Sequence, residues 1–340
     1  MAPDVLQHAE LPFPRSLPEF QRLFPDDAAC AAYLEKIRWD NGFVCPYCSA
    51  AEPPYRFANR PGVLRCRKCQ KDAALTAGTV MERTHTPLST WFWGAYLVSS
   101  MTPGMSAVQF QRQLGLTRYE TAFQILHKLR AGMVRPDADR IGGDLKGHVE
   151  VDETWVGGAS RGVGRGNHNQ TCVIAAVEVQ TRKPKGKAKT RRGGRMAGRL
   201  RLTVVPNRGA KALCGFVEGA VVPGSMIVTD AHQGYASLAS RGYEHLRVTE
   251  GGDPEVAEEY LPIVHLIFSN LKSWLLGVHH GVSPQHLQAY LNEFTFRFNR
   301  RFYPFNAFRS LLGIGGEASA PTYAELYSGN WQHPTASGHG

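Results

Sequence analysis

Acidic residues within an apolar stretch are the first part of this sequence that could do chemistry. Residues 147–158 read GHVEVDETWVGG, in which valines and a tryptophan surround Asp152 and Glu153. The pattern predicts a buried β-strand, and neighbouring residues on a strand point to opposite faces of its sheet. A buried carboxylate needs a partner, so one of the two should face a site. The alternative is an edge strand whose polar face meets water.

A second acid follows another predicted strand. Residues 225–230 form an apolar run, SMIVTD, that ends at Asp230. Sites in open α/β sheets gather at the carboxyl ends of strands, although an aspartate at a strand end is often only a helix cap. In phosphoryl transfer, two divalent ions about 3.5 to 4 Å apart activate the attacking hydroxyl and stabilise the leaving oxygen. Asp152 and Asp230 on neighbouring strands could supply the bridging and flanking ligands.

Two cysteine pairs have the spacing of a zinc site. Cys45-Pro-Tyr-Cys48 and Cys66-Arg-Lys-Cys69 are separated by seventeen residues. Two such knuckles can place four thiolates around one tetrahedral zinc, and a closed four-cysteine site is structural. The basic residues around the knuckles could contact phosphate or form only a solvated face, and they are Arg56, Arg60, Arg65, Arg67, Lys68 and Lys71.

Helical spacing surrounds the cysteine pairs. Residues 17–40 predict a helical lead-in with Asp26 or Asp27 as an N-cap, and residues 87–101 predict one longer helix.

Two amphipathic helices then follow with a short glycine turn between them. Residues 105–114 and 118–130 have helical spacing and are joined by residues 115–117, which is the layout of a helix-turn-helix. In that layout the second helix enters the major groove, and its first side chains reach base edges. The residues nominated for this role are Arg118, Tyr119 and Gln124. The alternative is a plain helical hairpin that packs on the next domain.

A basic segment separates two predicted strands. Nine Lys or Arg and no acid occur from Arg182 to Arg199, between the strands at 171–179 and 199–205. The segment predicts a loop that suits a polyanion, although a solvated hairpin tip needs no partner. The candidate DNA contacts are Lys185, Lys187, Lys189, Arg191, Arg192 and Arg195, with Arg300 and Arg301 after the last long helix.

The remaining segments predict an α/β domain. We expect helices at 210–219 and 233–239, a strand at 245–249, and a helix at 264–276 that ends at Gly277. Together with the earlier strands, this order of elements is that of a ribonuclease-H-like domain. His265 and Lys272 are seven residues apart and should project from one face of their helix.

Composition limits the class of partner. The chain has 340 residues, 43% of them hydrophobic, and a formal charge of +10. This charge favours a polyanion, first nucleic acid and second an anionic membrane surface. There is no apolar run of membrane-spanning length and the start lacks the features of a signal peptide, so we expect a cytoplasmic protein without a membrane partner.

The motifs together resemble a known family. The cysteine ribbon, the helix-turn-helix, VEVDETWVGG, VTDAHQGY and SNLKSWLLGVHHGVSPQHLQAYLNEFTFRFNRR are similar to the zinc-ribbon-bearing insertion-sequence transposases of the DDE superfamily, the ISXO-two-like group, over residues 15–312. The resemblance implies a retroviral-integrase-like catalytic domain with magnesium or manganese, cleavage at the element ends and strand transfer into target DNA. It places the first two acids on Asp152 and Asp230 and the following lysine on Lys272.

The third acid of the motif is where the sequence departs from the family. Two turns before Lys272 stands His265, thirty-five positions after Asp230, where many DDE enzymes have Glu. Some members of the group have Asn, for which Asn270 is the nearest candidate. Either neutral side chain would hold a second ion more weakly than a carboxylate. Glu293 could also be recruited, but we interpret it as a surface or ion-pair residue.

We therefore predict five segments. They are a helical lead-in at 1–40, a zinc ribbon at 41–80, a helix-turn-helix-like region at 85–135, a ribonuclease-H-like catalytic domain at 145–312 with a basic loop at 181–200, and a tail at 313–340. The first hypothesis for function is a transposase that acts on double-stranded DNA, both terminal repeats and target, as a dimer or larger assembly on the bacterial nucleoid. The second is a DNA-binding protein that has lost catalysis, and the third is a nuclease of the same fold.

Overall fold

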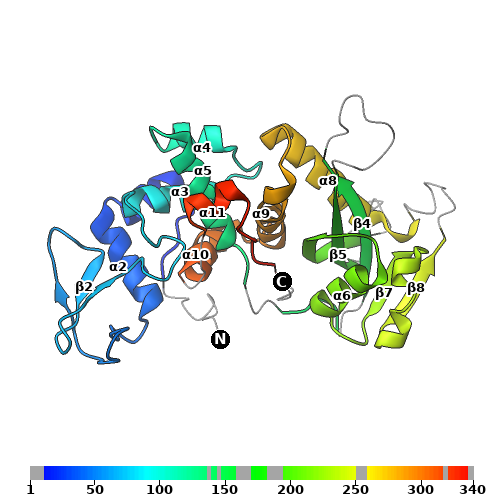
Figure 1. Cartoon of the computed structure of the whole chain (residues 1–340), viewed down its shortest axis with the longest axis horizontal. Coiled ribbons are helices and arrows are strands. Elements are labelled where there is room, and N and C mark those ends of the chain that lie inside the picture. The colour runs from blue at the N-terminus through cyan, green and yellow to red at the C-terminus, as the bar shows by residue number, and fades with distance from the viewer. Residues whose placement is uncertain are drawn as a thin grey trace. The chain divides into compact units, whose positions relative to one another are not determined.

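The chain forms two compact units. The computed structural model describes residues 11–135, 139–143, 147–157, 170–181, 194–249, 259–316 and 321–335. One unit comprises Met1–Arg135 with Arg300–Gln332, and the other comprises Pro136–Asn299 with His333–Gly340. Figure 1 shows the elements of both units. Within the described residues we find no helix with the length and apolar character needed to cross a lipid bilayer.

The first unit is helical apart from a small ribbon. Its helices are α1 (Leu17–Leu23), α2 (Asp27–Arg38), α3 (Leu88–Ser100), α4 (Ala107–Gln113), α5 (Tyr119–Ala131), α10 (Pro304–Gly315) and α11 (Tyr323–Ser328). The ribbon is a three-stranded antiparallel sheet of β1 (Tyr55–Arg56), β2 (Val63–Arg65) and β3 (Asp72–Ala74).

Two neighbouring aspartates cap different helices of this unit. The Oδ1 atom of Asp26 accepts the N–H of Ala29 at 2.8 Å and so caps α2. The carboxylate of Asp27 accepts the N–H groups of Leu88 and Ser89, at 3.2 and 2.9 Å, at the start of α3. The two residues that the sequence offered as alternative caps are therefore both caps, and Asp27 ties α2 to α3.

The C-terminal helices belong to this first unit, whereas the sequence predicts a catalytic domain that extends to residue 312. α10 packs against α2, α3 and α5. The ring of Phe308 on α10 lies 5.5 Å from that of Phe24 and 6.0 Å from that of Phe92. These apolar residues bury their surface against one another, which the helical spacing of α10 alone could not reveal.

The second unit contains a mixed five-stranded sheet with the order β6-β5-β4-β7-β8. Its strands are β4 (Gly147–Val156), β5 (Thr171–Thr181), β6 (Arg195–Val205), β7 (Met226–Asp230) and β8 (Glu244–Val248). β4, β5 and β6 are antiparallel neighbours, whereas β7 runs parallel to both β4 and β8. The strand at the centre of the sheet is β4, which carries the predicted acids.

Helices cover both faces of this sheet (Figure 1). They are α6 (Ala210–Ala220) on one face, and α8 (Pro262–His279) and α9 (Leu287–Asn299) on the other. Alternate residues of β5 enter the two cores: Val173 and Ala175 face α8 and α9, whereas Cys172 and Ile174 face the core that includes α6. Burial on both faces explains why β5 reads as a continuous apolar run.

Three local predictions need correction. The helix expected at 233–239 is replaced by two short 3-10 turns, η3 (Gln233–Tyr235) and η4 (Ala239–Arg241), with Tyr235 and Leu238 both buried. α8 continues through Gly277 and ends when His280 adopts a left-handed φ of 56°. The basic loop is shorter than expected, because Thr181 belongs to β5 and Arg195–Val205 is already strand β6.

An ion pair between a buried glutamate and a partly exposed arginine joins β5 to β6. Glu178 is 2% exposed and accepts hydrogen bonds from the backbone and side chain of Arg199, at 2.8 to 3.0 Å, and from the N–H of Gly142 at 3.0 Å. Burial alone would raise the pKa of Glu178, but these hydrogen bonds hold it below its ordinary value. A carboxyl with a depressed folded-state pKa stabilises the fold above its unfolded pKa, and this contribution is lost as the pH falls through the folded value.

We predict that Glu178→Gln lowers the free energy of unfolding at pH 7 by about 2 kcal/mol, less than for a fully buried pair because Arg199 is partly exposed. The difference should shrink as the pH falls below about 4, since the wild-type carboxyl is then protonated as well. Urea unfolding of both proteins, at pH 7 and again below about pH 4, measures this difference in the free energy of unfolding. Equal stability of the two proteins at pH 7 would contradict this account of the pair.

Candidate functional site

The register of two parallel strands brings the predicted aspartates together. β4 pairs with β7 so that Glu150 stands opposite Val228, and two residues further along each strand are Asp152 and Asp230. The two side chains therefore leave the sheet at the same level and on the same face. A third acid joins them: one carboxylate oxygen each from Asp152, Glu153 and Asp230 lie within 4.8 Å of one another.

Hydrogen bonds orient the two aspartates while leaving them accessible. The Oδ1 atom of Asp152 accepts the N–H of Glu153 at 2.8 Å, and its Oδ2 atom lies 3.2 Å from Nε2 of His265. The Oδ1 atom of Asp230 accepts the N–H of His232 at 3.0 Å. The side chains of Asp152 and Asp230 remain 13% and 25% exposed, so a cation could reach them from solvent.

Glu153 lies closer to this site than the sequence indicated. Strand alternation predicts that Glu153 points to the opposite face from Asp152, and its buried carboxylate does contact Tyr235, which belongs to the core that includes α6. It also forms an ion pair with Arg208, whose Nη2 atom is 3.8 Å from Oδ2 of Asp230. The carboxylate of Glu153 thus reaches those of the two aspartates, although neighbouring residues of a strand point to opposite faces.

Burial and charge shift the pKa values of these groups. Burial raises the pKa of Glu153, with the nearby Asp152 adding to the effect, while the hydrogen bond from Tyr235 and the charge of Arg208 oppose it. Burial also raises the pKa of Tyr235 well above its ordinary value, and the adjacent Glu153 raises it further. Burial would lower the pKa of Arg208, but Glu153 and Asp230 more than offset this and raise it. Arg208 is therefore a lasting positive charge beside the acids.

The α8 residues expected to complete the motif differ in position. His265, in the first turn of α8, contacts Asp152, whereas Asn270 is exposed. The two residues are five positions apart, which is about 140° around a helix, so they cannot both face β4. Lys272 is exposed and lies about 20° from His265, on the same side of the helix. Glu293 forms an ion pair with Arg297 at 3.3 Å, as expected, but it is buried rather than on the surface.

Glu150 is a residue of this region that we did not nominate. It is fully buried, and its Oε2 atom accepts the N–H groups of Ile263 and Val264, at 2.8 and 2.7 Å, at the start of α8. Its Oε1 atom is 3.7 Å from Nε2 of His148. The alternation of β4 contained the signal, because Glu150 stands two residues before Asp152 and so shares its face. By anchoring α8 to β4, Glu150 places His265 beside Asp152.

The donor atoms suit a hard divalent cation. Carboxylate oxygens are the ligands that magnesium and manganese prefer, and oxygens on opposite sides of an octahedral magnesium are about 4.2 Å apart. One oxygen from each of the three carboxylates lies within 4.8 Å of the others, so small movements would bring them onto one ion. The predicted ligands are Asp152, Asp230 and His265, and they could share a metal site with Glu153. Divalent ions bound at this site would supply Lewis acidity and an activated nucleophile.

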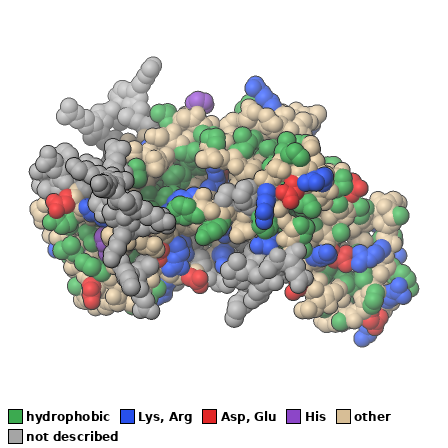
Figure 2. Space-filling view, turned by 180° about the vertical axis from the view of Figure 1, so that it is seen from behind, with side chains coloured by type: hydrophobic (Ala, Val, Ile, Leu, Met, Phe, Trp, Pro, Cys, Tyr) green, Lys and Arg blue, Asp and Glu red, His purple; other side chains and the backbone are tan. Residues whose placement is uncertain are grey.

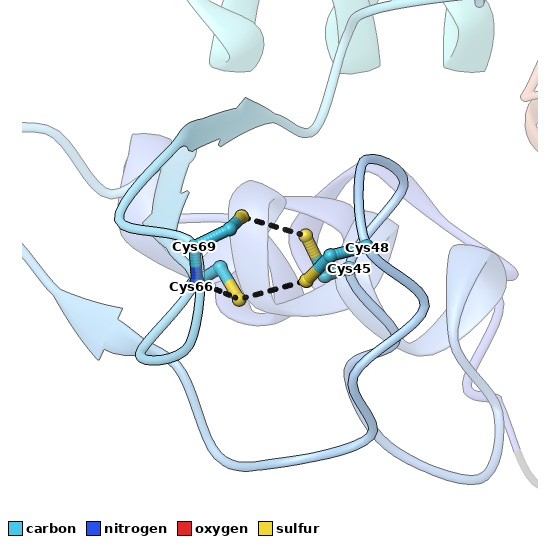
Figure 3. A group of neighbouring side chains, drawn as sticks. All are labelled: Cys45, Cys48, Cys66 and Cys69. Carbon is cyan, nitrogen blue, oxygen red and sulfur yellow. Dashed lines mark hydrogen bonds between the residues drawn. The ribbon is translucent and has the colours of Figure 1, made fainter.

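The four cysteines form a second candidate metal centre (Figure 3). Their Sγ atoms lie within 4.8 Å of one another, with 3.6 Å between Cys45 and Cys69 and 3.7 Å between Cys48 and Cys66. Zinc–sulfur bonds of about 2.3 Å in a tetrahedron require sulfur atoms about 3.8 Å apart. The side chains therefore fit one zinc ion, and the predicted structural zinc ribbon is supported.

The two knuckles repeat the same backbone geometry. Ser49 and Gln70, each directly after the second cysteine of its pair, adopt left-handed φ values of 56° and 57°. Their N–H groups donate to the carbonyl oxygens of Cys45 and Cys66, at 2.9 and 3.1 Å. Each tight turn thus directs two thiolates toward a common centre, although neither Ser nor Gln signals a left-handed residue in the sequence.

The basic residues of the ribbon are not equivalent. Arg56 pairs with Glu35 at 2.7 Å and Arg65 pairs with Asp72 at 2.6 Å, so these two are largely neutralised. Arg67 and Lys71 instead lie over the exposed rings of Tyr55 and Tyr47, 4.6 and 5.2 Å from the ring centroids. Figure 2 shows basic and apolar side chains side by side at the end of the molecule that holds the ribbon.

The helix-turn-helix layout is present at α4 and α5, with Gly115 in the turn at a φ of 62°. Arg118 and Tyr119 are exposed at the start of α5 and Gln124 is half-buried, whereas the helix is almost wholly buried from Ile125 onward. The first turn of α5 is thus the part that a ligand could contact.

The other predicted DNA contacts are only partly placed. Arg300 and Arg301 are half-buried and belong to the first unit, and Arg195 donates to the carbonyl oxygen of Glu259. The predicted contacts that lie outside the described residues are Lys185, Lys187, Lys189, Arg191 and Arg192.

Known proteins are similar to both units. Residues 144–299 match an ISXO2-like transposase domain, and residues 25–72 match a transposase zinc-ribbon domain. A relative from Halobacterium salinarum, described as an uncharacterized protein in transposable element ISH50, is 26% identical over 143 residues. That match covers 42% of this chain and 46% of the relative, so it spans about half the length of that protein.

We predict that the purified chain contains one zinc ion and that Cys66→Ser abolishes stoichiometric binding, because three thiolates leave the tetrahedron open. Elemental analysis of the dialysed protein measures the metal. Cys214→Ser is the control, since Cys214 is buried in the core that includes α6 and distant in sequence from both knuckles. Retention of one zinc ion by the Cys66→Ser protein would contradict the four-cysteine assignment.

Proposed function

Because the chain carries an ISXO2-like transposase domain and a transposase zinc ribbon, we propose that it is the transposase of an insertion sequence. The observation that carries this proposal is the position of Asp152 level with Asp230 on adjacent parallel strands. The strand order and the helices on both faces support a ribonuclease-H-like fold for residues 136–299. In that fold, carboxylates at this place hold the metal ions of phosphoryl transfer.

The reaction has two steps at this site. Water attacks the phosphorus atom at the element end, the P–O3′ bond breaks, and a 3′ hydroxyl is released. That hydroxyl then attacks a phosphodiester of the target, forming one P–O bond while another breaks, so no external energy source is needed. Asp152 and Asp230 would hold the divalent ions, and His265 would orient Asp152 through its contact at 3.2 Å.

The remaining groups would bind DNA. Lys272 is exposed on the side of α8 that carries His265, where its charge could contact a phosphate near the cut. The exposed start of α5, with Arg118 and Tyr119, would read the terminal repeats, while the zinc ribbon would contact the backbone. Because transposition joins two element ends to one target, we propose a dimer or larger assembly on DNA.

We predict that Asp152→Asn and Asp230→Asn each lower strand transfer at least about a thousandfold, which corresponds to about 4 kcal/mol of transition-state stabilisation. The assay joins a labelled duplex, ending in the inverted repeat that flanks the reading frame, to plasmid DNA in the presence of magnesium. His265→Ala should reduce joining more than Asn270→Ala, because only His265 contacts Asp152.

Binding of the same duplex is the control, and it should be unchanged in both aspartate variants. Undiminished joining by Asp152→Asn would refute the proposed site. Tight, salt-dependent binding by the wild type without cleavage would indicate a DNA-binding protein that has lost catalysis. Cleavage without joining would indicate a nuclease.

A further inference from the structure

The third acid of the motif is missing from α8, but β4 carries a carboxylate near the two aspartates. Where the motif expects a third carboxylate, α8 presents the imidazole of His265 to Asp152. The described residues nevertheless bring three carboxylates together, because an oxygen of Glu153 lies within 4.8 Å of oxygens from both Asp152 and Asp230. Glu153 comes from the same strand as Asp152, so its position depends on the sheet and not on how α8 is placed.

A positive charge already occupies the neighbourhood of these carboxylates. Arg208 pairs with Glu153 and lies 3.8 Å from Asp230, and its side chain is 38% exposed. Three carboxylates so close together repel one another unless a cation lies among them. Arg208 supplies one charge from the edge of the cluster, and its exposure leaves it room to turn toward solvent when a divalent ion replaces it.

We propose that Glu153 is the third carboxylate ligand of the catalytic metal site and that Arg208 is the counter-ion which Glu153 exchanges for metal. This inference rests on the proposed function. Tyr235 donates to the other oxygen of Glu153 and so fixes the position of its carboxylate. Once released, the guanidinium of Arg208 is free to contact a phosphate of the bound DNA.

The test is the affinity for Mn²⁺ of the zinc-loaded full chain, measured from the signal of free Mn²⁺ in electron paramagnetic resonance. Glu153→Gln alone would be ambiguous, because it leaves Arg208 to pair with Asp230. The comparison is therefore made in an Arg208→Gln background. We expect the Kd for Mn²⁺ to rise at least tenfold from R208Q to E153Q/R208Q. E153D/R208Q, which keeps the charge but shortens the side chain, should be weakened as well.

Matched variants separate ligation from loss of stability. Glu178→Gln removes another buried glutamate that pairs with an arginine, in the same sheet but opposite Val149 rather than near Asp152, and should change the Kd less than twofold. Tyr235→Phe removes the hydrogen bond that fixes the carboxylate of Glu153 and should weaken Mn²⁺ binding a few-fold. Thermal unfolding verifies that each variant is folded, and Tyr235→Phe keeps the test decisive if E153Q/R208Q does not fold.

Two results would overturn the inference. The first is binding of Mn²⁺ by E153Q/R208Q within twofold of R208Q. The second is the same result for E153D/R208Q, which would show that only the charge of Glu153 matters. An unchanged Kd for Mn²⁺ in Tyr235→Phe would also count against the inference. Failure of the wild type to bind Mn²⁺ at all is a different outcome, because it removes the two-metal function itself and this inference with it.

Discussion

The parallel pairing of β4 with β7 is the constraint on which the site depends. Its register fixes Asp152 level with Asp230, although the two residues are separated by two strands and a helix in the sequence. A shift of one residue would turn one aspartate to the opposite face of the sheet. The apolar cores on both faces prevent such a shift, because every buried side chain of the strand would move with it.

Buried charges extend this constraint to the elements around the sheet. Glu150 cannot be buried without partners, and it finds them in the first N–H groups of α8, where helices leave donors unsatisfied. The same strand thereby sets the position of α8 and of His265. Glu153 satisfies its own charge with Arg208 and Tyr235 on the other side of the strand. Glu150, Asp152 and Glu153, all on β4, thus position the residues on both faces of the site.

Sequence reasoning found the parts of this protein that depend on local pattern. The cysteine knuckles, the order of strands and helices, and the two aspartates follow from spacing, alternation and strand ends. It failed where the outcome depends on long-range packing. Phe308 joins α10 to the aromatic core of the first unit, and no periodicity in α10 indicates which core it will enter. Strand alternation predicts that Glu153 and Asp152 point to opposite faces, but alternation does not fix where the carboxylate of a longer side chain lies.

We propose that the carboxylates of Asp152 and Glu153 on β4 and of Asp230 at the end of β7 hold divalent ions. The most direct measurement is anomalous scattering from crystals grown with manganese. The account predicts a manganese peak in contact with Asp152, Glu153 and Asp230, with Arg208 turned away from Glu153. A peak bound by the two aspartates while Arg208 still pairs with Glu153 would contradict the assignment of Glu153. No peak between β4 and β7 would contradict the metal site as a whole.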